Sequence, residues 1–417
     1  MAVEASPERD VTAPIPYPLD QDPDGVNRPG LYLNPIYHRL RETGTGVGPV
    51  RCRDGTLAKL VTRYHDVKQV LRDSKAFSRE KAADADEVPL QNTLLGLDPG
   101  TGPNDHTQVR KAARDWFTPR AIERLKATTE ERAEAQLKAM VERGEPADLV
   151  TDFAFPFALN MVCDMLGLPQ EGRTQFREWG DAFLGTSRQT SMSSDEAAIY
   201  MAAYMDELVK KRREKPGDDL LSHIAAAGAH LSEETRTMLP ITIVIGGWET
   251  VVSSIGLQVL ALHEHPYGGY DTAYAYLADH PEEVPGAVTE LERMFSVTAA
   301  DAMPRRVMQD VTLPSGERLH EGDLVFPSIN AANYDPRVFP DPERMDFSRD
   351  FERNQHLSFG YGAHHCIGRH LGHLEVVTAI AALTRELPTL RPAVPPEEIT
   401  YKPDHKVLGP TALPVTW

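Results

Sequence analysis

The spacing of hydrophobic and polar residues predicts helices through most of the chain and short strands near both ends. Helical patterning covers residues 66–71, 105–116, 119–143, 152–166, 171–214 and 369–383. Residues 48–62 form two short runs around the turn sequence Arg53-Asp54-Gly55, which predicts a hairpin. Residues 304–327 contain further short β-like runs, and the closing LPVTW predicts another strand. The pattern indicates a mainly α fold with a small β portion.

A largely apolar run from Leu239 to Leu262 predicts a long central helix over residues 238–263. This run is long enough to cross a bilayer. However, Glu249 lies in mid-run after two glycines, and no cluster of Lys or Arg flanks the segment. These features favour the buried axis of a large globular protein, because such a helix is apolar on all sides.

Composition and charge exclude several classes of protein. The chain has 417 residues, of which 41% are hydrophobic and 25% charged, as in ordinary globular proteins. Its net charge of −18 argues against nucleic-acid binding, which needs a basic surface. Three cysteines argue against a disulfide framework and favour a reducing compartment. The N-terminus lacks an apolar core, so we expect no signal peptide and a cytoplasmic location.

The most informative segment is FGYGAHHCIG, residues 359–368. Gly360 and Gly362 predict a tight loop whose backbone can closely approach a flat ligand. Cys366 comes just before the helical run 369–383, so a thiolate there would gain from the helix N-terminal dipole and from nearby backbone N–H donors. A metal-binding thiolate is therefore one interpretation of this loop.

Two other interpretations of this cysteine are open. Cys366, His370 and His373, with His364 or His365, have the residue types of a mixed-ligand zinc site. A lone cysteine is also often a buried, inert structural residue.

Two charged pairs have helical spacing. His106 and Arg110 are four residues apart, so both can face one carboxylate-bearing ligand, although a solvated polar face has the same pattern. Glu290 and Arg293 form a Glu-x-x-Arg pair that shares a helix face. By itself such a pair can be a surface salt bridge of little energetic value.

The middle of the apolar helix reads Gly246-Gly247-Trp248-Glu249-Thr250. The glycines weaken the helix and favour a local kink. An acid beside an alcohol can order water and relay protons. The alternative is a buried glutamic acid neutralised by desolvation, next to a threonine that bonds back to the helix backbone.

These segments resemble those of the cytochromes P450. Residues 359–368 match the haem-binding signature Phe-Gly-x-Gly-x-His/Arg-x-Cys-x-Gly at every specified position, and the Glu-x-x-Arg, His-x-x-x-Arg and Gly-Gly-x-Glu-Thr segments occur in the expected order. The resemblance runs from about residue 30 to the end. It implies a triangular single-domain prism over residues 1–417, with the haem between the central helix and the cysteine loop. A β-containing lobe would comprise about residues 30–70, residues 304–330 and the C-terminal strands.

The resemblance also implies a role for each matching residue. Cys366 would bind the iron of haem b, and Phe359 would pack near its sulfur. Gly360 and Gly368 would shape the cofactor loop. The haem propionates would be held by His106, Arg110, His364 and Arg305, with Arg306 as the alternative to Arg305. Thr250 and Glu249 would deliver protons, while Glu290 and Arg293 would stabilise the fold.

The implied activity is insertion of one oxygen atom from O2 into an apolar organic substrate, by a tailoring hydroxylase or epoxidase of bacterial specialised metabolism. Its electrons would come from a ferredoxin and a ferredoxin reductase, with neither nucleic acid nor membrane as a partner. Docking residues would be Lys111, Arg114, Arg369 and His373. We expect pocket walls from residues 85–97, 176–200 and 295–300 and from the first half of the central helix. The named pocket candidates are Leu94, Leu95, Ile243, Val244, Gly246, Gly247 and Val297.

Other functions stay open at this point. The same fold could catalyse C–C bond formation or aryl coupling without oxygen insertion. Other classes are a zinc hydrolase and a haem-binding sensor or carrier. Residues 265–280 look longer and more aromatic than the family's usual connection, which predicts a surface insertion.

Overall fold

The computed structural model describes residues 11–17, 31, 33–82, 94–184, 192–227, 230–297, 303–402 and 407–417. The chain forms two compact units. The first comprises residues 1–99 and 290–366, and the second comprises residues 100–289 and 367–417. Each unit is described by itself below. The expectation of a single catalytic domain stays a prediction.

The first unit contains a six-stranded sheet in the order β1-β2-β3-β9-β6-β4. Its strands are β1 (Ile15–Pro16), β2 (Val47–Arg51), β3 (Leu57–Val61), β4 (Phe77–Ser78), β6 (Arg305–Val307) and β9 (Leu324–Pro327). The predicted hairpin is confirmed, because β2 and β3 pair antiparallel with Val47 opposite Val61. The predicted strands in residues 304–327 are also present, and they include the small hairpin of β7 (Val311–Thr312) and β8 (Arg318–Leu319).

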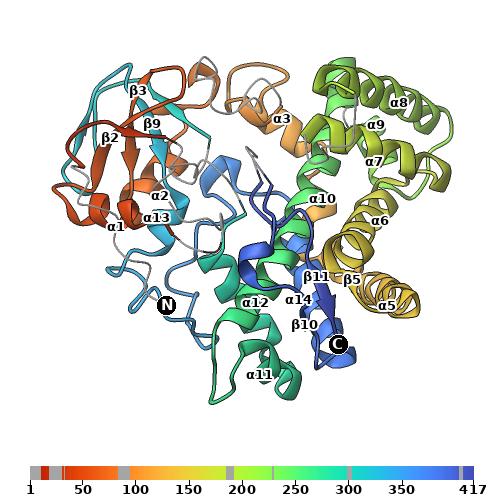
Figure 1. Ribbon diagram of the computed structural model, residues 1–417. Helices are drawn as coiled ribbons and strands as arrows, with labels where there is room; N and C mark the ends of the chain where they lie inside the picture. Colours follow the sequence, from red (N-terminus) through yellow and green to blue (C-terminus); the bar gives the residue numbers. More distant parts are fainter. Residues whose placement is uncertain are drawn as a thin grey trace. The chain divides into compact units, whose positions relative to one another are not determined.

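Both faces of this sheet are buried. Successive strand residues point to opposite sides, and neighbouring residues of β3 and β9 belong to two different apolar cores. Leu60 and Phe326 belong to one apolar core, together with residues of α1 (Pro35–Glu42). Their neighbours Val61 and Val325 belong to a second core with residues of α2 (Tyr64–Arg72). Figure 1 shows α1, α2 and α13 (Ile329–Asn333) around the strands β2, β3 and β9. The short 3-10 helices are η2 (Glu80–Ala82), η4 (Leu94–Gly96) and η9 (Gly362–His364).

The second unit is built mainly from helices around α10 (Glu233–Glu264), which packs against α6, α8 and α14 (Figure 1). Its other helices are α3 (His106–Lys111), η5 (Arg114–Phe117), α4 (Pro119–Glu123), α5 (Lys126–Arg143), η6 (Leu149–Ala154), α6 (Phe155–Leu166), α7 (Gln170–Leu184), α8 (Ser194–Glu214), α9 (Leu220–Ala227), α11 (Ala273–Asp279), η8 (Pro281–Glu283) and α14 (Arg369–Glu386). Helix α12 (Val284–Met294) belongs to both units. A three-stranded sheet joins β10 (Arg391–Pro392), β11 (Pro414–Thr416) and β5 (Ala147–Asp148). Strand β11 confirms the predicted C-terminal strand. The short helix η10 (Pro396–Glu398) lies between β10 and β11 in the chain.

Helix α10 begins five residues before the predicted start, at Glu233. The side chain of Ser232 caps it by accepting the backbone N–H of Thr235 at 3.2 Å, and Glu233 and Glu234 suit the positive end of the helix dipole. The predicted run 171–214 is two helices, α7 and α8.

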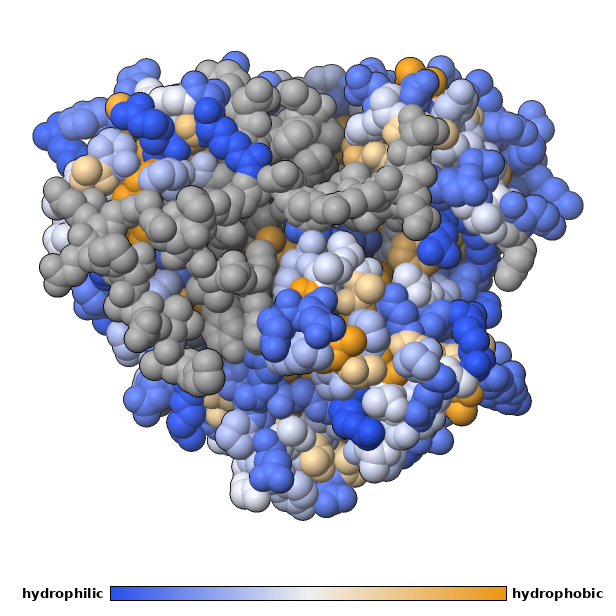
Figure 2. Space-filling model, viewed as in Figure 1, coloured by the Kyte–Doolittle hydropathy of each residue, from blue (hydrophilic) through white to orange (hydrophobic). Residues whose placement is uncertain are grey.

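Two helical stretches are apolar and long enough to cross a membrane, Leu149–Leu166 and Glu233–Glu264. Their most apolar windows are 72% and 56% buried inside the protein, as expected for core helices. Among the coloured residues in Figure 2, hydrophilic side chains dominate and hydrophobic ones form small scattered areas.

The aromatic segment 265–280 is not simply a surface insertion. Tyr267 and Tyr270 pair in a tight turn, and α11 then follows. Tyr274 is 1% exposed, and its hydroxyl donates to the carbonyl of Leu387 at 3.1 Å. The segment therefore extends the core of the second unit, which corrects the prediction.

Candidate functional site

Cys366 lies at the exposed end of a tightly closed loop in the first unit. Its backbone N–H donates to the carbonyl of Phe359 at 2.8 Å, and Gly360 N–H donates to the carbonyl of Leu357 at 2.7 Å. Gly360 has φ +71° and Gly362 has φ +75°, a conformation that favours glycine. The sequence therefore fixes a loop that presents the Cys366 thiol at the surface of this unit.

Gly362 lets the cysteine loop approach α2 closely. A Cβ at this position would lie 2.8 Å from the Cα of Arg72 and 2.8 Å from the carbonyl oxygen of Leu71. The predicted approach of the loop to a flat ligand stays a prediction. A Cβ at Gly360 would meet only the carbonyl of His364, at 3.6 Å.

The base of the cysteine loop is held by side chains from other segments of the first unit. Ser358 donates from Oγ to the carbonyl of Glu292 at 2.6 Å. Asn333 accepts the Leu357 N–H at 2.7 Å and donates to Ser358 Oγ at 2.8 Å. Both the oxygen and the nitrogen of the Asn333 side-chain amide bind the loop. Together with the Ser358 bond to Glu292, they fix the loop to α12 and α13. Phe359 and His364 are half-buried beside it.

Glu290 and Arg293 form a fully buried ion pair rather than a surface one. Nε and Nη2 of Arg293 each donate to the Glu290 carboxylate at 2.8 Å, and both side chains are 0% exposed. Arg349 also donates from Nε to both carboxylate oxygens at 3.1 Å. Arg293 further donates to the carbonyls of Asn333 and Pro342, each at 2.8 Å. Sequence reasoning missed Arg349, because nothing in the coil around it indicates a partner 59 residues away.

Arg305 is a deeply buried cation in the first unit. It is 1% exposed, and Nη1 donates to the carbonyls of Met303 and Pro304. Within the described residues, its Nη2 is buried without a hydrogen-bond partner. Burial and then the neighbouring charge of Arg79 lower the pKa of Arg305 well below its usual value, while Asp98 opposes this shift. Because a guanidinium remains charged in proteins, a further anion would be needed beside Arg305 to bind this charge.

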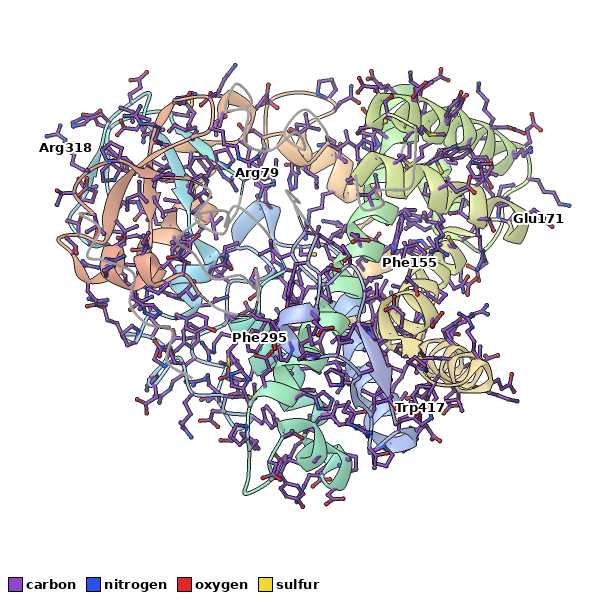
Figure 3. The ribbon with its side chains drawn as sticks, viewed as in Figure 1. Arg79, Phe155, Glu171, Phe295, Arg318 and Trp417 are labelled. Carbon is purple, nitrogen blue, oxygen red and sulfur yellow. The ribbon has the colours of Figure 1, made fainter. Side chains whose placement is uncertain are left out.

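Arg79 is a second cation that sequence reasoning missed (Figure 3). It directly follows β4, where its backbone N–H donates to Asp98 Oδ1 at 2.9 Å and Ser78 Oγ donates to the same carboxylate. Its Nη1 donates to the carbonyl of Leu95 at 2.9 Å. Burial lowers the pKa of Arg79 to about 10. Two neighbouring guanidinium groups thus share one nearby carboxylate, which strengthens the case for an anionic ligand here.

In the second unit, α10 has one open face. Thr242, Ile245, Gly246 and Thr250 are half-buried or exposed, although most of the helix is buried. These positions recur at helical spacing and so lie on one side of α10. Among the described residues, a Cβ added at Gly246 would have no atom within 4 Å, whereas one at Gly247 would contact Val162 at 3.4 Å. The helix is continuous through both glycines.

The predicted pocket residues of α10 are buried: Val244 is 0% exposed and Ile243 is 9% exposed. Their place in the pocket stays a prediction. In the first unit, Leu95 is 38% exposed, and Leu94 and Val297 are half-buried. Residues 85–93, 185–191 and 298–300 of the predicted pocket segments lie outside the described residues.

Glu249 and Thr250 face different sides of α10. The Thr250 hydroxyl donates to the carbonyl of Gly246 at 2.7 Å, which is the back-bonding expected of a helical threonine. Glu249 is 2% exposed and forms an ion pair with Lys402, which sequence reasoning missed. Lys402 also donates to Ser253 Oγ at 2.8 Å. The buried acid therefore has a buried cation beside it.

Trp248 does not occupy the open face. Its indole is 0% exposed and meets the ring of Phe155 edge-on at a centroid distance of 4.9 Å. Phe155, labelled in Figure 3, begins α6. A Cβ on Gly180 of α7 would overlap the Trp248 ring, so this glycine makes room for the indole.

The remaining predicted residues of the second unit lie on α3, η5 and α14. His106 and Arg110 are four apart on α3 and half-buried, and the helix is capped by Asp105, which accepts the Gln108 N–H at 3.0 Å. Gly368 is the N-cap of α14, where its carbonyl accepts the Gly372 N–H at 2.8 Å. Of the predicted docking residues, Lys111 and Arg114 are exposed, and Arg369 and His373 are half-buried.

The zinc alternative lacks a matching geometry. Across the parts of the chain that the structure describes, no three His, Cys, Asp or Glu side chains converge as metal ligands would. Burial, followed by the charges of Arg369 and His373, lowers the pKa of His370.

Comparisons with known proteins agree on one family. A family model described as Cytochrome P450 matches residues 284–413. Nocardicin C N-oxygenase of Nocardia uniformis subsp. tsuyamanensis is 36% identical over 93% of this chain and 96% of that protein. Mycinamicin IV hydroxylase/epoxidase of Micromonospora griseorubida is 35% identical over the same shares, 93% and 96%.

Solved structures give the same result for the fold. The mixed-function P450 MycG has a TM-score of 0.86 at 35% identity, over 97% of this chain and 100% of that chain. The LnmA cytochrome P450 hydroxylase from the leinamycin biosynthetic pathway of Streptomyces atroolivaceus S-140 has a TM-score of 0.85 at 32% identity, over 97% and 100%.

Proposed function

The chain belongs to the cytochrome P450 family, and we propose that it is a tailoring hydroxylase or epoxidase of bacterial specialised metabolism with Cys366 as its iron ligand. It has the P450 fold, and it is a haem-dependent monooxygenase that uses O2 and an apolar organic substrate. When bound, the haem supplies the oxygen-activating chemistry, while the protein supplies binding, orientation and electrostatics.

The single observation that carries the assignment is the cysteine loop. A thiol held at the exposed end of a glycine loop suits a metal ligand, whereas a structural cysteine is buried and inert. Cys163 shows the contrast, because burial raises its pKa to about 12. The residues of the chain fit the haem: Arg305 has a buried, unpartnered Nη2 among the described residues, which suits a propionate. His106, Arg110 and His364 would complete the propionate contacts.

We assign proton delivery to Thr250 and Glu249. The Thr250 hydroxyl lies on the open face of α10, where it can hydrogen-bond a water or a reacting group as well as the Gly246 carbonyl. Glu249 precedes it and is the acid through which protons would enter this face. Ile245 and Gly246 on the same face would line an apolar pocket for the substrate.

The names of the relatives support oxygen insertion over coupling. One relative is an N-oxygenase and another a hydroxylase/epoxidase. Electrons would come from a ferredoxin and a ferredoxin reductase in the cytoplasm. Lys111 and Arg114, which are exposed, and Arg369 and His373, which are half-buried, would attract the acidic surface of the ferredoxin.

The test of the proton role is Thr250→Ala. Removing the hydroxyl should raise peroxide released per NAD(P)H consumed by about tenfold, the scale of a modest acid–base contribution. A substrate found by a screen of the iron spin state, with ferredoxin and reductase added, allows product and peroxide to be counted together. Thr289→Ala is the control, because this half-buried threonine makes the same back-bond, 2.9 Å to Pro285, on α12. Unchanged coupling in Thr250→Ala would remove Thr250 from the proton path.

A further inference from the structure

The acid of the acid–alcohol pair is held by a lysine from the C-terminal segment. Glu249 is 2% exposed and Lys402 is 7% exposed, and the two form an ion pair in the core of the second unit. Lys402 also donates to Ser253 at 2.8 Å, one helical turn after Glu249 on α10. The lysine therefore contacts two successive turns of the central helix.

Close packing fixes the lysine in this place. Its backbone N–H donates to the carbonyl of Gly409 at 3.0 Å, and the preceding Tyr401 pairs with Pro410. A Cβ on Gly409 would lie 2.8 Å from the Cβ of Ser253. Gly256 likewise makes room for Pro410, whose Cγ would lie 2.8 Å from a Cβ there. The C-terminal segment thus lies directly on the face of α10 that carries Glu249.

This geometry separates the acid from the alcohol. Glu249 and Ser253 continue the side of α10 that carries Thr242, because residues seven and eleven positions apart lie on one side of a helix. The C-terminal segment covers this side from Glu249 onward, whereas Thr250 points about 100° away from Glu249 and is half-buried. A buried carboxylate without a counterion takes up a proton, whereas one beside an ammonium group stays ionised. Lys402 therefore keeps the carboxylate charged and holds it beneath the C-terminal segment.

We propose that Lys402 is a positioning residue of this monooxygenase: through its ion pair it fixes the charge and direction of Glu249 and thereby controls proton supply to Thr250. The carboxylate serves the open face only when the ion pair opens. This inference rests on the proposed role of Glu249, so its test includes a variant of the glutamate itself.

The test compares Lys402→Met, Lys402→Arg, Glu249→Gln and the double variant Lys402→Met/Glu249→Gln as haem-loaded proteins. Product formed per NAD(P)H should fall on the order of tenfold in Lys402→Met, with a larger solvent isotope effect on NAD(P)H oxidation. Lys402→Arg keeps the charge and should recover most of the coupling. The double variant should match Glu249→Gln, because Lys402 acts only through the acid.

Thermal unfolding supplies a readout independent of turnover. Lys402→Met removes the cation beside a buried carboxylate and should lower Tm by about 5 °C, whereas the double variant should recover much of that loss. If Lys402→Met does not retain haem, Lys402→Gln, which keeps a hydrogen-bond donor, takes its place in every comparison.

Three results would overturn the inference. A lowered Tm with unchanged coupling would make Lys402 a structural residue only. A double variant that couples much worse than Glu249→Gln would show that Lys402 acts independently of the acid. Failure of arginine to restore coupling would exclude the charge as the cause. By contrast, unchanged coupling in Glu249→Gln would refute the proposed proton role of Glu249 itself, and the inference would fall with it.

Discussion

Replacing Arg293 by methionine should destabilise the protein far more than replacing an exposed arginine. Arg293 donates two 2.8 Å hydrogen bonds to Glu290, and neither side chain has any exposed surface. The substitution keeps an apolar stem of similar length but leaves the Glu290 carboxylate without its closest cation. It also removes the charged donor from the carbonyls of Asn333 and Pro342.

The size of the effect follows from what stays behind. Breaking a buried ion pair by removing one partner typically costs about 3–5 kcal/mol of unfolding free energy. Arg349 still donates to both oxygens of Glu290 at 3.1 Å, so the carboxylate keeps one cation. We therefore expect the loss to fall near the lower end of that range, at about 3 kcal/mol.

Guanidinium unfolding of the haem-loaded protein, followed by far-UV ellipticity and by haem absorbance, measures this loss. Arg344→Met is the matched control, because its guanidinium is paired with Asp346 at 2.9 Å but is 66% exposed. Exposed pairs contribute about 0–1 kcal/mol, so the control should be nearly neutral. If Arg293→Met unfolds within 1 kcal/mol of Arg344→Met, the buried pair does not stabilise the fold as argued. Arg293→Lys, which keeps the charge but loses the two-pronged contact, should lie between the two.

Local patterns predicted the parts of this fold that depend on neighbouring residues. The hairpin of β2 and β3, the short strands of residues 304–327 and the central helix all follow from runs that the sequence shows directly. The start of α10 was placed five residues too late, because its first turn is polar and is fixed by the Ser232 cap rather than by apolar spacing. The cysteine loop was found because all of its specified residues lie within ten positions.

The same reasoning could not determine which side of α10 is open. The helix is apolar on nearly every side, so periodicity gives no preferred face. As a result Thr242 and Ile245, which lie on the open face, were not among the named pocket candidates. Only the packing of α6, α8 and α14 around α10 decides this.

Residues whose partners are distant in the chain were missed for a related reason. Lys402 is 153 residues from Glu249, and Arg349 is 59 residues from Glu290. Neither lies in a motif, and a lysine or arginine in coil is most often solvated. The charge that each one neutralises becomes evident only when the fold brings the carboxylate into the interior.

Three further predictions test the thiol, the packing around Trp248 and the open face. Cys366→Ser should abolish the thiolate-type ferrous–CO spectrum. Cys163→Ala should keep it, because the Cys163 thiol is buried and its pKa is raised to about 12. A thiolate-type spectrum that survives in Cys366→Ser would exclude the Cys366 sulfur as the ligand. Gly180→Ala should cost about 1–3 kcal/mol, because the new methyl group overlaps the Trp248 ring and the packed core of the second unit has no room to shift. Gly246→Ala should instead raise stability by up to about 1 kcal/mol, since alanine favours helix and the new methyl group meets no atom within 4 Å. That methyl group would reduce the space on the open face, so Gly246→Ala should also weaken spin-state binding of bulky substrates, and unchanged affinity across substrate sizes would show that this face does not line the pocket.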